Sequence, residues 1–239
     1  MHGEGVRTAE GEATSPAATV SEAIRSRHSC RAFSRQPVDP ATVRDILEVA
    51  RFAPSGGNLQ PWLVHVLSGE TLSRFRTWLE PKLQALPSGG ATEYPVYPPD
   101  LQEPYRSRRR KCGEDLYSLV GVARDDRAGK LRQFARNYDF FGAPVGMFFF
   151  VDRCMGSAQW SDIGMFMQNI MLLARERGLA TCPQEAWAVW HLEVAEFLGV
   201  EPRLMLFCGL ALGVADGSAP INRLRTERTA LDGFVKFHE

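Results

Sequence analysis

The sequence predicts one α+β domain that carries a single long inserted loop. Helical patterns alternate with short apolar runs of strand length, and no linker or internal repeat divides the chain. The 239 residues, 44% hydrophobic and 23% charged, are enough for one large domain with a sizeable core. We therefore expect a small, polar, mobile tail over residues 1–19 and a domain over residues 20–239, with an inserted loop at 86–110.

Capping and periodicity mark the first two helices. Residues 20–33 begin with helical spacing and end in a basic stretch of short side chains. Asp39 is the expected N-cap of the next helix, and Pro40 suits its first position. Its apolar stripe follows the i, i+3, i+4, i+7 pattern at Val43, Ile46, Leu47 and Ala50. Pro54 ends this helix.

Strand and helix patterns alternate through the rest of the chain. Apolar runs predict strands at 62–69, 143–152 and 203–213. Helical patterns occupy 71–83, 111–122, 130–142, 160–178 and 191–199. The helix at 160–178 is the longest, and it is apolar around most of its circumference. Such a helix belongs in the middle of a core or at a subunit interface.

The segment 86–110 differs in composition, because proline, glycine and tyrosine replace the periodic apolar pattern. Loops of this length within a domain are often lids or binding loops. Its tyrosines, Tyr94, Tyr97 and Tyr105, either cover a bound ligand or belong to a surface loop packed on itself. The basic run at 106–111 favours an acid-paired helix start over a nucleic-acid site.

The charge balance and the cysteines limit the class of protein. Lys plus Arg and Asp plus Glu both number 28, so nothing argues for nucleic acid or a polybasic membrane contact. The five cysteines are scattered without a CxxC pair, which fits reduced thiols in a cytoplasmic protein. No apolar run reaches membrane-spanning length, and residues 1–19 lack the apolar region of a secretory signal.

Several standard sites are absent from the sequence. It has no phosphate-binding GxxxxGK[ST] loop, no GxGxxG after a strand, no GxSxG and no HExxH. The five histidines lack metal-ligand spacing, so we expect no metal site. Ser-His-Asp catalysis has no supporting pattern.

Groups suited to an anion occur near both ends of the chain. RSRHSCRAF places Arg27, His28, Ser29 and Arg31 within five residues, and NRLRTER adds Arg225 and Arg228. Arginine offers fork-shaped donors to a phosphate, and serine adds a hydroxyl. Each cluster alone is also compatible with solvated surface charge. The glycines of APSGGNLQPW at 53–62 suit either a turn or the close approach of a ligand to the main chain.

These motifs occur together in one order: RxRHSxRxF, APSGGNxQPW, FFGAPVG, PQEAW and RTER. In that order the chain resembles the FMN-dependent nitroreductase family from about residue 20 to its end. The resemblance implies a central, mostly antiparallel sheet flanked by helices. It also implies an intertwined homodimer with an extended C-terminal tail.

The resemblance further implies roles for named residues. Arg27 and Ser29 would hold the FMN phosphate, Arg31 would reach the N1/C2 edge of the flavin, and His28 would lie nearby. The other subunit would line the flavin ring and the ribityl chain with Pro54, Ser55, Gly56 and Asn58. The main chain near Glu185, with Gln184 and Ala186 beside it, would face flavin N5. The phosphate clamp would be completed by Arg225 and Arg228.

Two departures from the family pattern stand out. Ala186 replaces a glycine that is frequent in the segment near N5, and the spacing of the basic tail is longer than the usual Lys-x-Arg. No catalytic acid or base side chain is required, because the cofactor carries the chemistry.

The activity implied is hydride transfer from NAD(P)H to a nitroaromatic, quinone or similar flat acceptor, by a ping-pong mechanism. Reductive dehalogenation, flavin destruction and flavin binding without turnover are the alternatives on this fold. Trp187, directly after the N5 segment, is expected in the pocket wall, with core packing as the alternative. The physiological acceptor and the choice between NADH and NADPH do not follow from the sequence.

Overall fold

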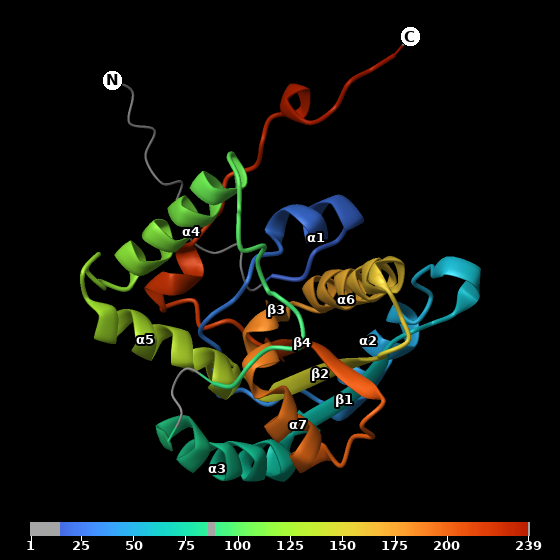
Figure 1. Cartoon of the computed structure of the whole chain (residues 1–239). Coiled ribbons are helices and arrows are strands. Elements are labelled where there is room, and N and C mark those ends of the chain that lie inside the picture. Colours follow the sequence, from blue (N-terminus) through green and yellow to red (C-terminus); the bar gives the residue numbers. More distant parts are fainter. Residues whose placement is uncertain (1–14, 86–88, 239) are drawn as a thin grey trace.

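The computed structural model describes residues 15–85 and 89–238. They form a four-stranded antiparallel sheet with helices around it (Figure 1). The strands are β1 (Leu63–Ser68), β2 (Val145–Asp152), β3 (Ala180–Gln184) and β4 (Leu204–Gly213). Their order across the sheet is β1-β2-β4-β3, and all three pairings are antiparallel. The predicted α+β fold with a mostly antiparallel sheet is therefore confirmed.

Helices cover both faces of the sheet (Figure 1). On one face lie α3 (Gly69–Ala85) and α7 (His191–Leu198), and on the other lie α2 (Pro40–Ala50) and α6 (Ser157–Glu176). Because β2 alternates, Phe148 and Phe150 join the cluster with α3, whereas Met147 and Phe149 join the cluster with α6. Burial on both faces explains why β2 is an unbroken apolar run.

The remaining helices lie around the ends of these layers. They are α1 (Val20–Ser26), α4 (Tyr105–Leu119) and α5 (Arg127–Ala135), together with 3-10 turns at 56–58, 136–142, 185–190, 220–223 and 231–233. The predicted cap of α2 is confirmed, because the Asp39 side chain accepts a hydrogen bond from the Ala41 N–H at 2.9 Å. The strand β3 had no sequence prediction, since its five residues include a proline.

The predicted loop at 86–110 has a different C-terminal boundary in the structure. Residues 86–88 lie outside the described residues, 89–104 are irregular, and 105–110 belong to α4. Arg106 of α4 pairs with Glu103, which precedes the helix, and Lys111 pairs with Asp115 at 2.9 Å. The basic run is thus an acid-paired helix start, as the sequence indicates.

The end of the predicted N-terminal tail packs on the domain. Residues 1–14 lie outside the described residues. Ala17 is buried and donates its N–H to the Arg175 carbonyl at 3.0 Å. Thr19 then caps α1 through a reciprocal capping box with Glu22. Residues 15–19 are therefore attached to the body of the protein, which corrects the expected boundary at residue 19.

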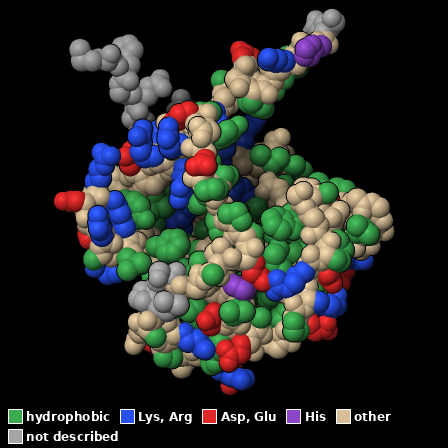
Figure 2. Space-filling view, in the orientation of Figure 1, with side chains coloured by type: hydrophobic (Ala, Val, Ile, Leu, Met, Phe, Trp, Pro, Cys, Tyr) green, Lys and Arg blue, Asp and Glu red, His purple; other side chains and the backbone are tan. Residues whose placement is uncertain are grey.

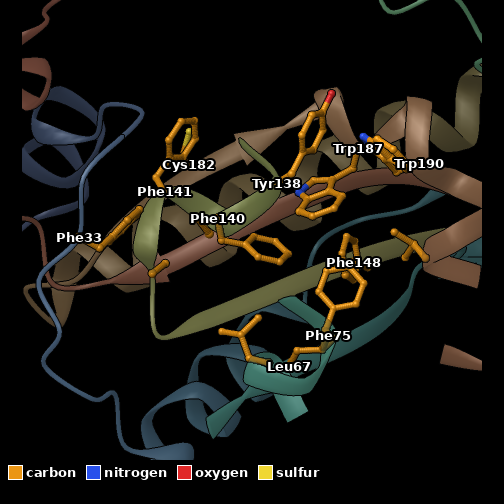
Figure 3. Close-up of a cluster of buried hydrophobic side chains, with 14 of the residues drawn as sticks. Phe33, Leu67, Phe75, Tyr138, Phe140, Phe141, Phe148, Cys182, Trp187 and Trp190 are labelled. Carbon is orange, nitrogen blue, oxygen red and sulfur yellow. The ribbon is translucent and has the colours of Figure 1, made fainter. Parts of the chain in front are cut away.

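The largest aromatic cluster fills the space between the sheet and α3 (Figure 3). Trp187 lies at its centre and is fully buried. Its ring contacts Tyr138, Phe140 and Phe148, with centroids 4.8–5.4 Å apart. Gly209 of β4 makes room for it, because a Cβ at that position would lie 2.2 Å from Trp187 Cδ1. Trp187 therefore belongs to the core.

Across residues 15–85 and 89–238, no helix is both long and apolar enough to cross a lipid bilayer. The same residues contain no group of three or more His, Cys, Asp or Glu side chains that could hold a metal ion. All five cysteines are free, and Cys30, Cys182 and Cys208 are buried.

Candidate functional site

The basic groups from the two ends of the chain meet in the folded protein. Burial lowers the pKa of Arg27, and the positive charge of Arg228 lowers it further. Burial also lowers the pKa of His28 to about 4, and the charges of Arg225, Arg175 and Arg27 act in the same direction. The repulsion between these cations indicates that the two clusters lie near each other in the folded protein. This confirms only their proximity, which the two sequence clusters could not establish.

Asn222 fixes the backbone of this basic region, and the sequence gives no signal for it. This buried side chain accepts a hydrogen bond from the Arg31 N–H at 2.9 Å. Its amide donates to the carbonyls of Ala32 and Asp216, at 2.7 and 2.9 Å. A single side chain thereby connects residues 31–32 to the C-terminal segment. We regard Asn222 as a positioning residue.

Arg175 is a second residue that the sequence analysis misses. It lies near the end of α6 and is buried. The guanidinium donates to Ser26 Oγ at 3.1 Å and to the carbonyls of Leu179 and Ser15, at 3.3 and 2.8 Å. Its positive charge contributes to the lowered pKa of His28. A long, mostly apolar helix gives no indication that one arginine turns inward.

A cavity of about 770 Å³ is lined by Arg31 but not by Arg27, His28, Arg225 or Arg228. Arg31 lines it together with Gln184, Glu185 and Ala186, where β3 ends and the following 3-10 turn begins. The Gln184 amide donates to the Asn137 carbonyl at 2.8 Å, and burial raises the pKa of Glu185. The volume lies within the range of small-molecule sites, about 300–1,000 Å³.

The glycine segment is exposed and does not line this cavity. Gly57 and Asn58 have φ angles of 58° and 57°, the left-handed region in which glycine and asparagine are favoured. The Gly56 N–H donates to Oδ2 of Asp162 at 3.2 Å, so a buried acid of α6 fixes the turn. None of Pro54, Ser55, Gly56 and Asn58 is among the cavity's lining residues.

The 89–97 stretch is tied to the body of the protein rather than packed on itself. The Gly90 N–H donates to the Val189 carbonyl at 2.8 Å, and Glu93 pairs with Arg153. The hydroxyl of Tyr94 donates to the Phe207 carbonyl. These contacts fix one end of the stretch against residues that line the cavity.

The four residues expected to contact substrate differ in whether they line the cavity. Tyr97 lines the cavity, whereas Tyr94 packs against Trp160 and Phe207 and is not among the lining residues. Tyr105 is 59% exposed on α4 and also lies away from the cavity. Trp187 is a core residue, which corrects the expected pocket wall. Of the four, only Tyr97 keeps a position suited to substrate.

The residues present fit a flat cofactor with a phosphate. The Arg27 and Arg228 cations suit a phosphate, and the cavity bounded by Arg31 and Gln184 suits a ring system. Among the buried polar atoms without a hydrogen-bond partner in the described part of the chain, His28 Nε2 and Gln184 Oε1 belong to predicted site residues. Such atoms are expected to be satisfied by a ligand or by water.

Comparisons with known proteins agree with this arrangement. The family model described as the nitroreductase family matches residues 24–214. The chain therefore belongs to the nitroreductase family.

Three similar proteins carry specific names. A 4-nitrobenzoate reductase of Pseudomonas putida is 39% identical over 90% of this chain and 93% of its own length. A chloronitrobenzene nitroreductase of Comamonas testosteroni is 39% identical over 92% of this chain and 97% of its own length. The crystal structure of the FMN and NADPH-dependent nitroreductase NfnB from Sphigopyxis sp. strain HMH superposes with a TM-score of 0.89. It is 45% identical and covers 92% of this chain and 99% of its own.

Proposed function

We propose that this protein is an FMN-dependent oxidoreductase that uses NADPH to reduce nitroaromatic compounds. The observation that carries the proposal is the placement of Arg31 and the Gln184–Ala186 turn in one cavity, with Arg27, near Arg228, on the segment that leads to Arg31. Similarity to an FMN and NADPH-dependent enzyme supports the choice of cofactor and nucleotide. The reductase names of the relatives support this activity over dehalogenation, flavin destruction or flavin binding without turnover.

Each residue of the site has a defined task in this proposal. Arg27, Ser29 and Arg228 would hold the phosphate of FMN, with His28 and Arg225 beside it. When bound, FMN supplies the hydride chemistry that no side chain here provides. Arg31 would place a fixed positive charge at the edge of the ring system. The main chain at Glu185 would orient the ring, and its neighbours Gln184 and Ala186 would border it.

Arg31 should affect reactivity more than flavin binding. A fixed cation near the ring stabilises the negative charge that reduction adds. We expect Arg31→Ala to lower the reduction potential of bound FMN by about 30–60 mV and to slow its reduction by NADPH. Spectroelectrochemical titration measures the potential. Arg35→Ala, an exposed neighbour, is the matched control. A wild-type potential in Arg31→Ala would remove Arg31 from this role.

We further propose that the protein is a homodimer, in which the partner subunit donates the segment Pro54–Asn58 to the flavin. This segment is exposed in one chain and is flanked by Phe52 and Leu59, which are 76% and 53% exposed. The C-terminal tail extends away from the body of the protein (Figure 1), and its Phe234 and Phe237 are exposed. Burial of such apolar groups favours association.

Sedimentation analysis of the FMN-loaded protein is expected to give a dimer. The double variant Phe52→Arg/Leu59→Arg should dissociate more readily and lose FMN in parallel, because two charges would enter the proposed interface. Leu192→Arg, a 68% exposed position on α7, is the control. An active, flavin-loaded monomer would disprove the shared site.

The proposed activity is tested by steady-state rates with NADPH and NADH against a panel of nitroarenes and quinones. We expect turnover with nitroarenes and a preference for NADPH. We also expect parallel double-reciprocal lines, because nicotinamide and acceptor would use one open face in turn. Failure to reduce any nitroarene while FMN stays bound would overturn the proposed activity.

A further inference from the structure

The helix α4 directs one arginine into the wall of the cavity. Arg109 lines the cavity, and its guanidinium lies 4.0 Å from the ring centroid of Tyr97. Tyr117 of the same helix and Phe134 of α5 line the same cavity. Figure 2 shows the Lys and Arg side chains of this region gathered at the upper left. Together α4, α5 and Tyr97 form a wall, here called the α4–α5 wall, that combines aromatic rings with one cation.

Two other basic residues of α4 have carboxylate partners, and Arg108 lies over the Tyr105 ring. Arg106 pairs with Glu103, and Lys111 pairs with Asp115 and with Glu227 of the C-terminal segment. In the described part of the chain, Arg109 has no carboxylate partner; its side chain is exposed and its guanidinium lies over the Tyr97 ring. Its charge is therefore available to a ligand in the cavity.

The two arginines that line the cavity come from different parts of the fold. Arg31 follows α1 and lines the cavity with Gln184 and Glu185, the group proposed for the flavin. Arg109 belongs to the α4–α5 wall, with Tyr97 stacked beside it. A flat ligand that lies on the flavin therefore has an aromatic surface and a second cation within the same cavity.

We propose that the preferred acceptor is a nitroarene that carries an anionic group such as a carboxylate, and that Arg109 is the residue that selects it. The inference rests on the proposed function. Relatives are named for charged and for uncharged nitroarenes alike, so their names do not decide between the two classes. The cation in the wall favours the charged class, because a carboxylate on the acceptor gains an ionic partner there and an uncharged acceptor does not. A planar guanidinium pairs with a carboxylate through two parallel hydrogen bonds.

The phosphate of NADPH is the other possible source of an anion. In that nucleotide the 2′-phosphate is separated from the reactive ring by two riboses and a pyrophosphate. A carboxylate on a nitroarene is separated from the nitro group by one benzene ring. Because Arg109 lines the same cavity as the residues proposed for the flavin, the compact acceptor suits its position better.

The test compares Arg109→Gln with Arg110→Gln, the adjacent arginine, which does not line the cavity. Both variants keep a polar side chain and lose one charge from the same helix. For Arg109→Gln we expect kcat/KM for 4-nitrobenzoate to fall by about 10–100-fold, since a charge-assisted pair is lost. Nitrobenzene should stay within about twofold, and Arg110→Gln should match the wild type with both acceptors.

Charge reversal provides an independent arm of the test. Arg109→Glu should favour 4-nitrobenzylamine over 4-nitrobenzoate, which reverses the order expected for the wild type. The rate of flavin reduction by NADPH and by NADH is followed separately in Arg109→Gln. If flavin reduction by NADPH slows in Arg109→Gln while reduction by NADH does not, Arg109 binds the 2′-phosphate of NADPH and the proposal is wrong.

A binding measurement gives a readout that does not depend on turnover. Titration of the oxidised, FMN-loaded protein with 4-nitrobenzoate perturbs the flavin spectrum and yields a dissociation constant. We expect this constant to rise by about 10–100-fold in Arg109→Gln with FMN content unchanged. Equal losses for 4-nitrobenzoate and nitrobenzene would overturn the proposal while leaving the proposed reductase activity intact. A wild-type protein that reduces no nitroarene would instead refute the proposed function.

Discussion

Trp187→Ala is expected to destabilise the protein by about 3–5 kcal/mol, the range for removing a fully buried tryptophan. The indole contacts Tyr138, Phe140 and Phe148, and Gly209 is fitted against it. Truncation leaves a cavity that these rings can fill only by leaving their present positions. The midpoint of thermal unfolding, measured without FMN and at fixed protein concentration, should fall by about 6–20 °C.

The control for this variant is Tyr105→Ala. Tyr105 is 59% exposed on α4, so its removal should change the free energy of unfolding by less than about 0.5 kcal/mol. The comparison separates the two roles that the sequence allows for Trp187. If Trp187→Ala melts like the wild type and alters only the KM for acceptors, the core assignment is wrong.

Arg27→Ala is expected to weaken FMN binding by about 10–100-fold. A charge-assisted hydrogen bond to phosphate contributes on the order of 1.5–3 kcal/mol, and Arg27 is partly buried. The loss has a second consequence. Removing this cation relieves part of the repulsion on His28, so the pKa of His28, which burial chiefly holds at about 4, should rise slightly when no anion is bound.

Fluorescence titration of the apoprotein with FMN measures this effect. Arg25→Ala is the matched control, because Arg25 is an exposed residue at the end of the same helix. The control should bind FMN like the wild type. Unchanged affinity in Arg27→Ala would show that the phosphate lies elsewhere.

The sequence predicts the framework of this fold well because its signals are local. Asp39 and Pro40 mark the start of α2, and the apolar run of β2 marks a strand buried on both faces. The strand β3 could not be found in this way. It is five residues long, includes Pro183, and forms through pairing with β4, a partner that periodicity does not identify.

The candidate site is predictable only where a motif names the residue. RHSxR and the RTER tail point to Arg27 and Arg228, and the fold brings them together. Asn222, Arg175 and Asp162 act through contacts to residues distant in sequence, so no local pattern reveals them. For Trp187 the sequence suggests a site role that the structure does not support. Its position next to the Gln184–Ala186 turn suggests a pocket wall, but its side chain is buried in the core.

The most direct test of the proposed function follows the flavin through its two half-reactions without oxygen. One equivalent of NADPH, added to FMN-loaded protein without an acceptor, should bleach the yellow absorbance and release NADP⁺. Addition of 4-nitrobenzoate should then restore the absorbance as the nitro group is reduced. Flavin that NADPH leaves oxidised, or reduced flavin that no nitroarene reoxidises, would contradict the assignment of this protein as a nitroreductase.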